Sequence, residues 1–456
     1  MTLQSINPYN GDTITTYQPF SAHQTEIAIQ QAESAFKDWR LVPFAERRDR
    51  LKKAAEILQA NAREYAHLMA LEMGKPVQQG RAESEKCAWV CDYYAEHGEM
   101  FLQPEEIQTD AQKSYVSYSP LGVILGIMPW NFPFWQVFRF VAPTLMAGNT
   151  ILLKHASNVS GCALAIEELL EKAGFPPNVF QTLLIPSKDI QHVIADSRIQ
   201  GVSLTGSTAA GRAVASMAGK HLKKCVLELG GSDAYVVLED ADLEQAAKIC
   251  VQGRLVNTGQ SCIAAKRFIV PEAKLREFEE RVVALFSDQR AGDPMDENTT
   301  LGPLARLDLR EQLHQQVQKS KKLGARLLLG GEIPKGPGAF YPATVLSDVK
   351  SGMPAYEEEL FGPVAAIIPA FHETMALELA NDSVFGLGAA VLTADPEKGE
   401  RIARDELQAG CCFVNAFVRS DPRLPFGGIK ESGYGRELSR HGIREFVNAK
   451  TVYVSH

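Results

Sequence analysis

Short apolar segments alternate with helical segments along most of this chain, and this alternation limits the possible folds more than any other feature of the sequence. Residues 121–128, 151–154 and 201–204 are short apolar runs of the kind that form buried strands. Residues 161–173 and 208–218 have the spacing of apolar residues that is typical of helices. Strands that alternate with helices of about ten to fifteen residues are typical of a parallel sheet covered by helices. We therefore predict an α/β fold.

The rest of the chain extends this pattern. Residues 22–105 have helical character, with helical spacing over 25–39 and over 44–73. The tail, 450–454, and the segment 113–118 alternate like edge strands, and a terminal edge strand can pair with another subunit. Further strands are expected at 226–229, 234–238, 267–270, 326–329 and 364–369, and further helices at 273–286, 307–323 and 373–381.

Length and composition indicate a soluble globular protein of two α/β domains. The chain has 456 residues, of which 45% are hydrophobic and 22% are charged. Its net charge of −8 argues against nucleic acid as a partner, because phosphates require a basic surface. An anionic small molecule is still compatible with this charge, since a few local arginines can override the global field.

The cysteines and the apolar segments exclude several classes of protein. The 8 cysteines form no CxxC pair and HExxH is absent, so we expect neither a disulfide framework nor a metal site. The N-terminus lacks the features of a signal peptide, and the apolar stretch 121–148 contains Asn131, Gln136 and Arg139, which argues against a membrane span. A reducing cytoplasm is the expected location.

Three segments carry residues suited to covalent catalysis. Cys262 ends the run Asn-Thr-Gly-Gln-Ser-Cys, Glu228 lies in Leu-Glu-Leu-Gly-Gly, and Asn131 lies in Pro-Trp-Asn-Phe-Pro. A thiol can attack an electrophilic carbon, and a carboxylate can then draw a proton from the water that releases the product. We therefore expect two-step covalent chemistry.

Six motifs in a fixed order resemble those of the NAD(P)-dependent aldehyde dehydrogenase superfamily, and the match runs from Asn7 almost to the C-terminus. The motifs are PWNFP (129–133), TGS (205–207), LELGG (227–231), GQSC (259–262), EELFGPV (358–364) and PFGGIKESGYGRE (425–437). The resemblance implies a Rossmann-type dinucleotide-binding domain (1–104 and 121–230), an α/β catalytic domain (231–431) and a small β oligomerisation arm (105–120 and 444–456).

The resemblance also implies catalytic roles. Cys262 would be the nucleophile, Asn131 a donor in the oxyanion hole, and Glu228 the base that activates water. Because relatives that use coenzyme A generally lack this glutamate, water is the expected acceptor. The alternatives are a buried structural cysteine, as we expect for Cys162, Cys225 and Cys250, a turn-forming asparagine and a glutamate in a salt bridge at a strand end.

The predicted cofactor is NAD or NADP. The segment 205–207 opens a helix after a strand, where free N–H groups can bind phosphate, although an ordinary capped helix would look the same. Lys154 matches a lysine that contacts the adenosine ribose, but His155 replaces the usual proline after it. Ser157 stands where NAD-preferring relatives often carry glutamate, so we expect NADP to be tolerated. The implied cofactor-binding set is Trp130, Lys154, Ser157, Thr205, Gly206, Ser207, Leu229, Glu359 and Phe361.

The substrate is expected to be an aldehyde, with succinate semialdehyde favoured. Arg139 stands where succinate-semialdehyde dehydrogenases hold the distal carboxylate, and Phe426 is expected to line the substrate tunnel or to lie near the nicotinamide. A second arginine of many such enzymes is replaced by Val256. Candidate substitutes are Arg254, Arg419 and Arg423.

Three alternatives stay open at this point. Arg139 could be a helix arginine that reaches solvent. The enzyme could act on another aldehyde, such as glutarate semialdehyde or an aromatic or small aliphatic aldehyde, or the chain could be a non-catalytic relative. Overall the chain most resembles the short bacterial succinate-semialdehyde dehydrogenases that accept either dinucleotide, and the family resemblance implies a homodimer or homotetramer.

Overall fold

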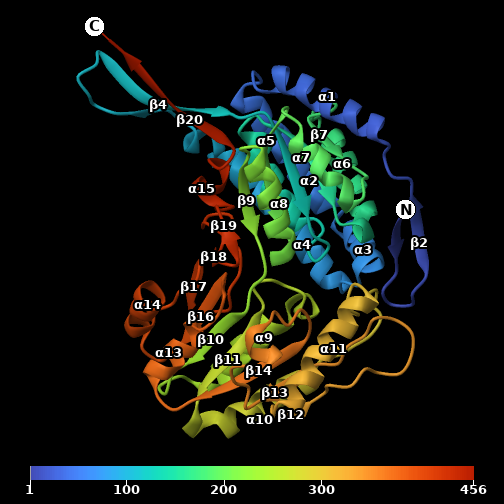
Figure 1. Cartoon of the computed structure of the whole chain (residues 1–456), viewed down its shortest axis with the longest axis vertical. Helices are drawn as coiled ribbons and strands as arrows, with labels where there is room; N and C mark the ends of the chain where they lie inside the picture. The colour runs from blue at the N-terminus through green and yellow to red at the C-terminus, as the bar shows by residue number, and fades with distance from the viewer. Residues whose placement is uncertain (1, 456) are drawn as a thin grey trace.

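The computed structural model describes residues 2–455 and has two large α/β layers, which lie at opposite ends of the body in Figure 1. Segments coloured blue to green form one layer and segments coloured yellow to orange form most of the other. The strand–helix alternation therefore does produce the predicted α/β fold.

The first sheet has six strands in the order β19-β9-β8-β5-β6-β7, and all neighbours are parallel except β19 and β9. Along β5, Val123 and Leu125 pack with α1, α7 and α8, whereas Ile124 packs with the helices of the opposite face. Helices thus cover both faces, as the apolar run predicts. The strands are β5 (Val123–Met128), β6 (Thr150–His155), β7 (Phe180–Thr182), β8 (Ile199–Thr205), β9 (Lys224–Glu228) and β19 (Gly433–Tyr434). The helices are α1 (Ala22–Trp39), α2 (Phe44–Ala60), α3 (Ala62–Met73), α4 (Val77–Phe101), α5 (Trp135–Met146), α6 (Ser160–Lys172), α7 (Ile190–Ala195) and α8 (Thr208–Lys220).

The second sheet has seven strands in the order β12-β13-β14-β11-β10-β16-β17, and only β12 is antiparallel to its neighbour. Helices α9 and α10 pack on one face and α11 to α14 on the other. The strands are β10 (Asp233–Val237), β11 (Ala265–Pro271), β12 (Arg326–Leu329), β13 (Thr344–Ser347), β14 (Val364–Ala370), β16 (Gly388–Leu392) and β17 (Cys411–Val414). The helices are α9 (Leu243–Leu255), α10 (Leu275–Ser287), α11 (Leu307–Lys322), α12 (Pro354–Glu357), α13 (Glu373–Asn381) and α14 (Pro396–Asp405).

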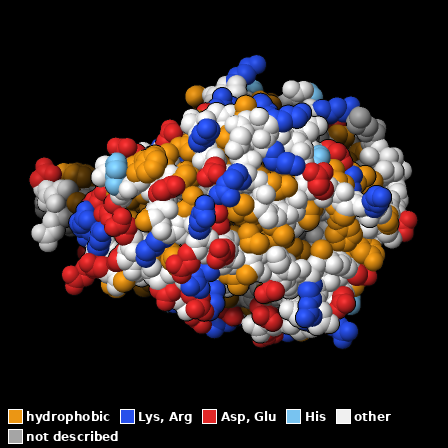
Figure 2. All heavy atoms as spheres, turned by 90° about the horizontal axis from the view of Figure 1, so that it is seen from below, with side chains coloured by type: hydrophobic (Ala, Val, Ile, Leu, Met, Phe, Trp, Pro, Cys, Tyr) orange, Lys and Arg blue, Asp and Glu red, His pale blue; other side chains and the backbone are white. Residues whose placement is uncertain are grey.

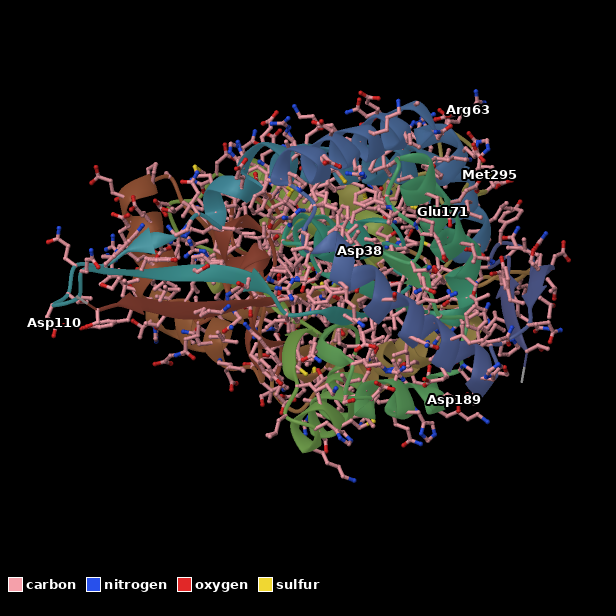
Figure 3. All side chains as sticks on the ribbon, turned by 90° about the horizontal axis from the view of Figure 1, so that it is seen from above. Asp38, Arg63, Asp110, Glu171, Asp189 and Met295 are labelled. Atoms are coloured by element: carbon pink, nitrogen blue, oxygen red, sulfur yellow. The ribbon has the colours of Figure 1, made fainter. Side chains whose placement is uncertain are left out.

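A third sheet forms an arm that projects from the body (Figure 1). Strand β20 (Val447–Val454) pairs antiparallel with β4 (Lys113–Pro120), which in turn pairs with β3 (Glu105–Glu106). Asp110 lies at the outer end of the arm, far from Asp189 on the body (Figure 3). The tail that the sequence predicts as an edge strand is therefore an edge strand of this sheet. The chain also forms the short strands β1 (Leu3–Ile6), β2 (Thr13–Tyr17), β15 (Phe385–Gly386) and β18 (Ile429–Lys430), the helix α15 (Ser439–Ile443) and four short 3-10 helices.

The surface mixes both signs of charge. On the face drawn in Figure 2, Lys and Arg side chains alternate with Asp and Glu side chains around patches of hydrophobic ones. Among residues 2–455, no helix is both long enough and apolar enough to cross a membrane.

Two expectations from the sequence need correction. The helical segment 44–73 is two helices, because Asn61 leaves helical geometry (φ −106°, ψ 15°) between α2 and α3. The helical region also ends at Phe101, and Glu105 already belongs to β3. Helix α5 has no polar face that would reveal it in the sequence, because all 12 of its residues are buried.

Candidate active site

Cys262 lies in a tight turn between α9 and β11, and the turn depends on an unusual backbone. Asn257, Thr258 and Gly259 all have left-handed φ values (54°, 56° and 73°). A side chain at position 259 would overlap the carbonyl of Gly362, so glycine is required there. The Asn-Thr-Gly run therefore bends the chain just before the cysteine.

A buried lysine, Lys266, stabilises this turn through hydrogen bonds to its backbone carbonyls. Its Nζ donates to the carbonyl oxygens of Ser261 (3.0 Å), Cys262 (2.8 Å) and Ala264 (3.2 Å). It also lies 3.8 Å from Oε1 of Glu359, which accepts a hydrogen bond from the Gly231 N–H. The ammonium thus joins the cysteine turn to a carboxylate of the neighbouring cavity. No motif in the sequence marks this lysine as part of the site.

Cys262 separates two cavities and, among the described residues, is the one that lines both. One cavity, of about 640 Å³, is mostly apolar and holds Arg139 and Phe426; we call it the substrate-side cavity. The other, of about 760 Å³, is lined in part by the carboxyl ends of strands in the first sheet; we call it the dinucleotide-side cavity.

Burial raises the pKa of the Cys262 thiol to about 12, and the charges of Arg139 and Lys266 oppose this shift. The thiol is therefore placed for contact with two different molecules, and it needs a base or a bound partner to ionise.

Asn131 lies beside the cysteine turn. Its Nδ2 donates to the Gln260 carbonyl (3.1 Å), and its own carbonyl accepts from Nδ2 of Asn257 (2.7 Å). Because an amide nitrogen carries two hydrogens, one N–H of Asn131 is still available to an oxygen near Cys262. The geometry therefore allows Asn131 to donate to a substrate oxygen.

Glu228 ends strand β9 and is 2% exposed. Within the described chain, neither of its carboxylate oxygens has a hydrogen-bond partner. Burial raises the pKa of Glu228 well above its usual value, while the charge of Arg139 opposes the shift and that of Glu437 adds to it. Its charge is also felt at the Cys262 thiol. An unpaired buried carboxyl of raised pKa is typical of a catalytic acid or base, and the salt bridge considered as an alternative is absent among the described residues.

Arg139 on α5 is buried instead of reaching solvent, and it already has an anionic partner. Its guanidinium forms an ion pair with Glu437, which is also buried. Nη2 donates to Oγ1 of Thr205 (3.3 Å), and the guanidinium lies over the ring of Phe426 at 4.6 Å. Arg139 therefore lines the substrate-side cavity with a charge that Glu437 largely balances, and Phe426 lines the same cavity.

All nine residues of the predicted cofactor-binding set line the dinucleotide-side cavity. Ser207 caps α8 by accepting from the Ala210 N–H (3.3 Å), so the helix begins at the cavity wall. Trp130 and Phe361 meet edge to face at 5.6 Å, and Nδ2 of Asn158 is buried there without a partner among the described residues. Burial lowers the pKa of Lys154 to about 8. A helix N-terminus, a cation and aromatic walls fit the phosphates and rings of a dinucleotide.

His155, which stands where the resemblance implies a proline, is buried between two backbone segments. Its Nδ1 accepts from the Ala156 N–H (3.0 Å), and its Nε2 lies 2.9 Å from the Pro133 carbonyl. These contacts join the end of β6 to the loop that carries Asn131. Burial lowers the pKa of His155 to about 4, so the ring is neutral at pH 7.

The proposed substitutes for a second substrate arginine differ in their surroundings. Arg254 is buried and donates to the carbonyls of Gly259, Leu360 and Gly362, and it lines neither cavity. Arg423 is paired with Asp421. Arg419 lines the substrate-side cavity and is exposed. Of the three, only Arg419 is placed to face a substrate.

Comparison with known proteins agrees with this geometry. Residues 1–452 match the model of the aldehyde dehydrogenase family. A probable NADP+-dependent succinate-semialdehyde dehydrogenase of Synechocystis sp. is 50% identical over 455 residues, which cover 100% of each chain. An NAD(P)+-dependent succinate semialdehyde dehydrogenase of Escherichia coli is 49% identical, over 98% of this chain and 97% of that one. The solved structure of succinic semialdehyde dehydrogenase from Streptococcus pyogenes in complex with NADP+ superposes with a TM-score of 0.97 at 38% identity, with 100% of each chain covered.

The chain therefore belongs to the aldehyde dehydrogenase family, whose members oxidise aldehydes with NAD(P)+. The family that the six motifs indicate is confirmed, and so is the fold that it implies.

Proposed function

We propose that this chain is a succinate-semialdehyde dehydrogenase that passes its acyl group to water. The observation that carries the proposal is the position of Cys262, which faces an apolar substrate-side cavity on one side and the dinucleotide-side cavity on the other. The names of the relatives from Synechocystis sp. and Escherichia coli support this choice of aldehyde.

In the first step, the Cys262 thiol loses its proton to a base, and the charges of Arg139 and Lys266 favour the resulting thiolate. Its Sγ then bonds to the aldehyde carbon, and the C=O π electrons move to the oxygen, which becomes an alkoxide. The free N–H of Asn131 and the backbone N–H of Cys262 donate to this oxygen. Lys266 keeps the turn in place, since three of its carbonyls bind the same ammonium. A nicotinamide dinucleotide held in the dinucleotide-side cavity would supply the acceptor for the hydride that leaves the adduct carbon, and loss of that hydride would leave a thioester on Cys262.

In the second step, Glu228 takes a proton from the attacking water. The water oxygen bonds to the thioester carbon, the C–S bond breaks, and the acid leaves with the thiolate restored. The raised pKa of Glu228 makes its carboxylate a stronger base than an exposed glutamate, and the Arg139 charge limits the rise.

We propose that Lys154, Ser207 and Glu359 hold the dinucleotide together with the other residues of the cofactor-binding set. Ser157 at the cavity wall is neutral and exposed, so it would not repel a 2′-phosphate, and both NAD and NADP are accepted.

We also propose that the protein is a homodimer or homotetramer assembled through the arm. The outer edge of β20 is unpaired within the described chain, and Tyr453 is 53% exposed there. Because the chemistry needs a reduced Cys262, we propose a reducing cytoplasm as the location.

A substrate panel tests the proposed function. Dinucleotide absorbance is followed with NAD+ or NADP+ and with succinate semialdehyde, glutarate semialdehyde, benzaldehyde, butanal or glycolaldehyde. We expect the highest kcat/KM with succinate semialdehyde. A higher value with another aldehyde would assign that aldehyde instead, and no turnover with any of them would contradict the enzymatic function.

A further inference from the structure

The charged side chains of the substrate-side cavity differ in whether they have a partner. Glu83 pairs with Lys75 outside the cavity, Lys248 pairs with Glu244 (2.6 Å), and Arg139 pairs with Glu437. Two cations are left. Within residues 2–455, no carboxylate forms an ion pair with Lys86 or with Arg419, in contrast to the other charged groups of the cavity.

These two cations lie in different environments. Arg419 is exposed, and water screens its charge. Lys86 is partly buried on α4, its ammonium lies over the ring of Trp135 at 4.3 Å, and its Nζ donates to Oγ of Ser420 (2.8 Å). Burial lowers the pKa of Lys86 to about 8; the nearby Arg139 charge adds to the effect, and the charges of Glu83 and Asp421 oppose it. Lys86 is thus a desolvated cation that forms no ion pair within the described chain.

The position of Lys86 in its helix directs it into the cavity. Gln79, Glu83 and Lys86 follow at intervals of four and three residues, so they share one face of α4, and all three line the cavity. On that face Glu83 is engaged by the backbone N–H groups of Phe134 and Trp135 (both 2.9 Å), which leaves Lys86 as the group facing a substrate.

We propose that Lys86 binds the carboxylate of the aldehyde substrate and thereby selects aldehydes that carry a carboxylate at the far end. This inference rests on the proposed function and names the side chain that gives it specificity. The Ser420 hydroxyl accepts from the ammonium, so its own hydrogen can be donated to the second carboxylate oxygen. A desolvated cation gains a strong charge-assisted contact when such an anion enters.

Arg139 takes a secondary part in this arrangement. Glu437, Thr205 and the Phe426 ring already engage its guanidinium. A substrate carboxylate near Arg139 would compete with Glu437, whereas near Lys86 it displaces no anion. The unpaired cation is therefore the better anchor.

The test compares kcat/KM for succinate semialdehyde and for butanal, which has the same carbon number without the carboxylate. The variants are Lys86→Met, Lys86→Arg and, as a matched loss of charge in the same cavity, Arg419→Met. We expect Lys86→Met to lower kcat/KM for succinate semialdehyde about 10- to 100-fold, the range of a charge-assisted hydrogen bond, and to change butanal less than about twofold. Lys86→Arg should retain part of the preference, and Arg419→Met should change it less than about threefold.

The outcomes separate this inference from the proposed function. If the native enzyme prefers succinate semialdehyde but Lys86→Met lowers both substrates equally, or neither, the inference is wrong while the proposed function stands. A selective loss in Arg419→Met and not in Lys86→Met would also overturn it. If the native enzyme shows no preference for succinate semialdehyde over butanal, the proposed substrate is wrong, and the inference falls with it. A misfolded variant would lose activity with butanal as well as with succinate semialdehyde. Retained turnover of butanal therefore shows that a variant is folded and that its loss is selective.

Discussion

Gly427 packs directly against Glu228: a β-carbon on Gly427 would lie 2.7 Å from Oε1 of that carboxylate. Gly427 also has a left-handed φ of 155°. The absence of a side chain at Gly427 thus leaves room for the carboxyl group that we assign as the base. This explains why the motif at 425–437 carries glycine at position 427.

We expect Gly427→Ala to lower kcat by about 100-fold, because displacing a catalytic group by about 1 Å can cost that much. Gly174→Ala is the matched control, since Gly174 also has a positive φ (85°) but a β-carbon there would have nothing within 4 Å. Steady-state kinetics and thermal melting of both variants make the comparison. If Gly427→Ala and Gly174→Ala lose kcat equally, backbone strain explains the effect. If Gly427→Ala loses no kcat, the proposed crowding of Glu228 is wrong.

Two variants should block the two covalent steps, formation and hydrolysis of the thioester, one at a time. Cys262→Ala should abolish turnover and leave dinucleotide binding intact, because the cysteine carries the first bond. Glu228→Gln should still form the thioester but release it slowly, since an amide cannot take the proton from water. Intact-protein mass spectrometry after mixing with substrate and dinucleotide should show an acyl adduct on Glu228→Gln only. Substantial oxidation by Cys262→Ala would exclude the covalent mechanism.

Cofactor choice can be tested at Ser157. We expect Ser157→Glu to raise KM for NADP+ at least about tenfold and to affect NAD+ little, because the new carboxylate would repel the 2′-phosphate. Ser157→Gln has the same shape without the charge and serves as the control. Equal effects on both dinucleotides would place the 2′-phosphate away from residue 157.

Much of the site could be predicted from the sequence because its parts are local. Asn257 to Gly259 form the turn before Cys262 within one short run, and a strand followed by Ser207 predicts the capped helix. Contacts between distant residues could not be predicted in this way. The ion pair of Arg139 with Glu437 joins α5 to the segment after β19, and no pattern in the sequence assigns partners across such a separation.

The structural role of residues that are buried on every side could not be predicted from the sequence either. Helix α5 lacks the amphipathic spacing that reveals a surface helix, and Lys266 sits in an otherwise ordinary strand segment, β11. For Lys86, the sequence predicts a shared helix face, since its spacing from Gln79 and Glu83 puts three polar residues on one side of α4. The missing information was which face of α4 lines a cavity, and that follows only from the packing.

His155 should make stability depend on pH. The folded ring has a pKa of about 4 because of burial, whereas an unfolded histidine has a pKa of about 6.5. Between these values the unfolded chain binds a proton that the folded chain does not, so stability falls as the pH falls from about 6.5 to about 4. At pH 5 the loss should be about 2 kcal/mol. His155→Gln removes the titration and should show a smaller decrease in melting temperature between pH 7 and pH 5 than the native chain. Parallel decreases in the two proteins would mean that residue 155 does not exchange a proton on unfolding in this range.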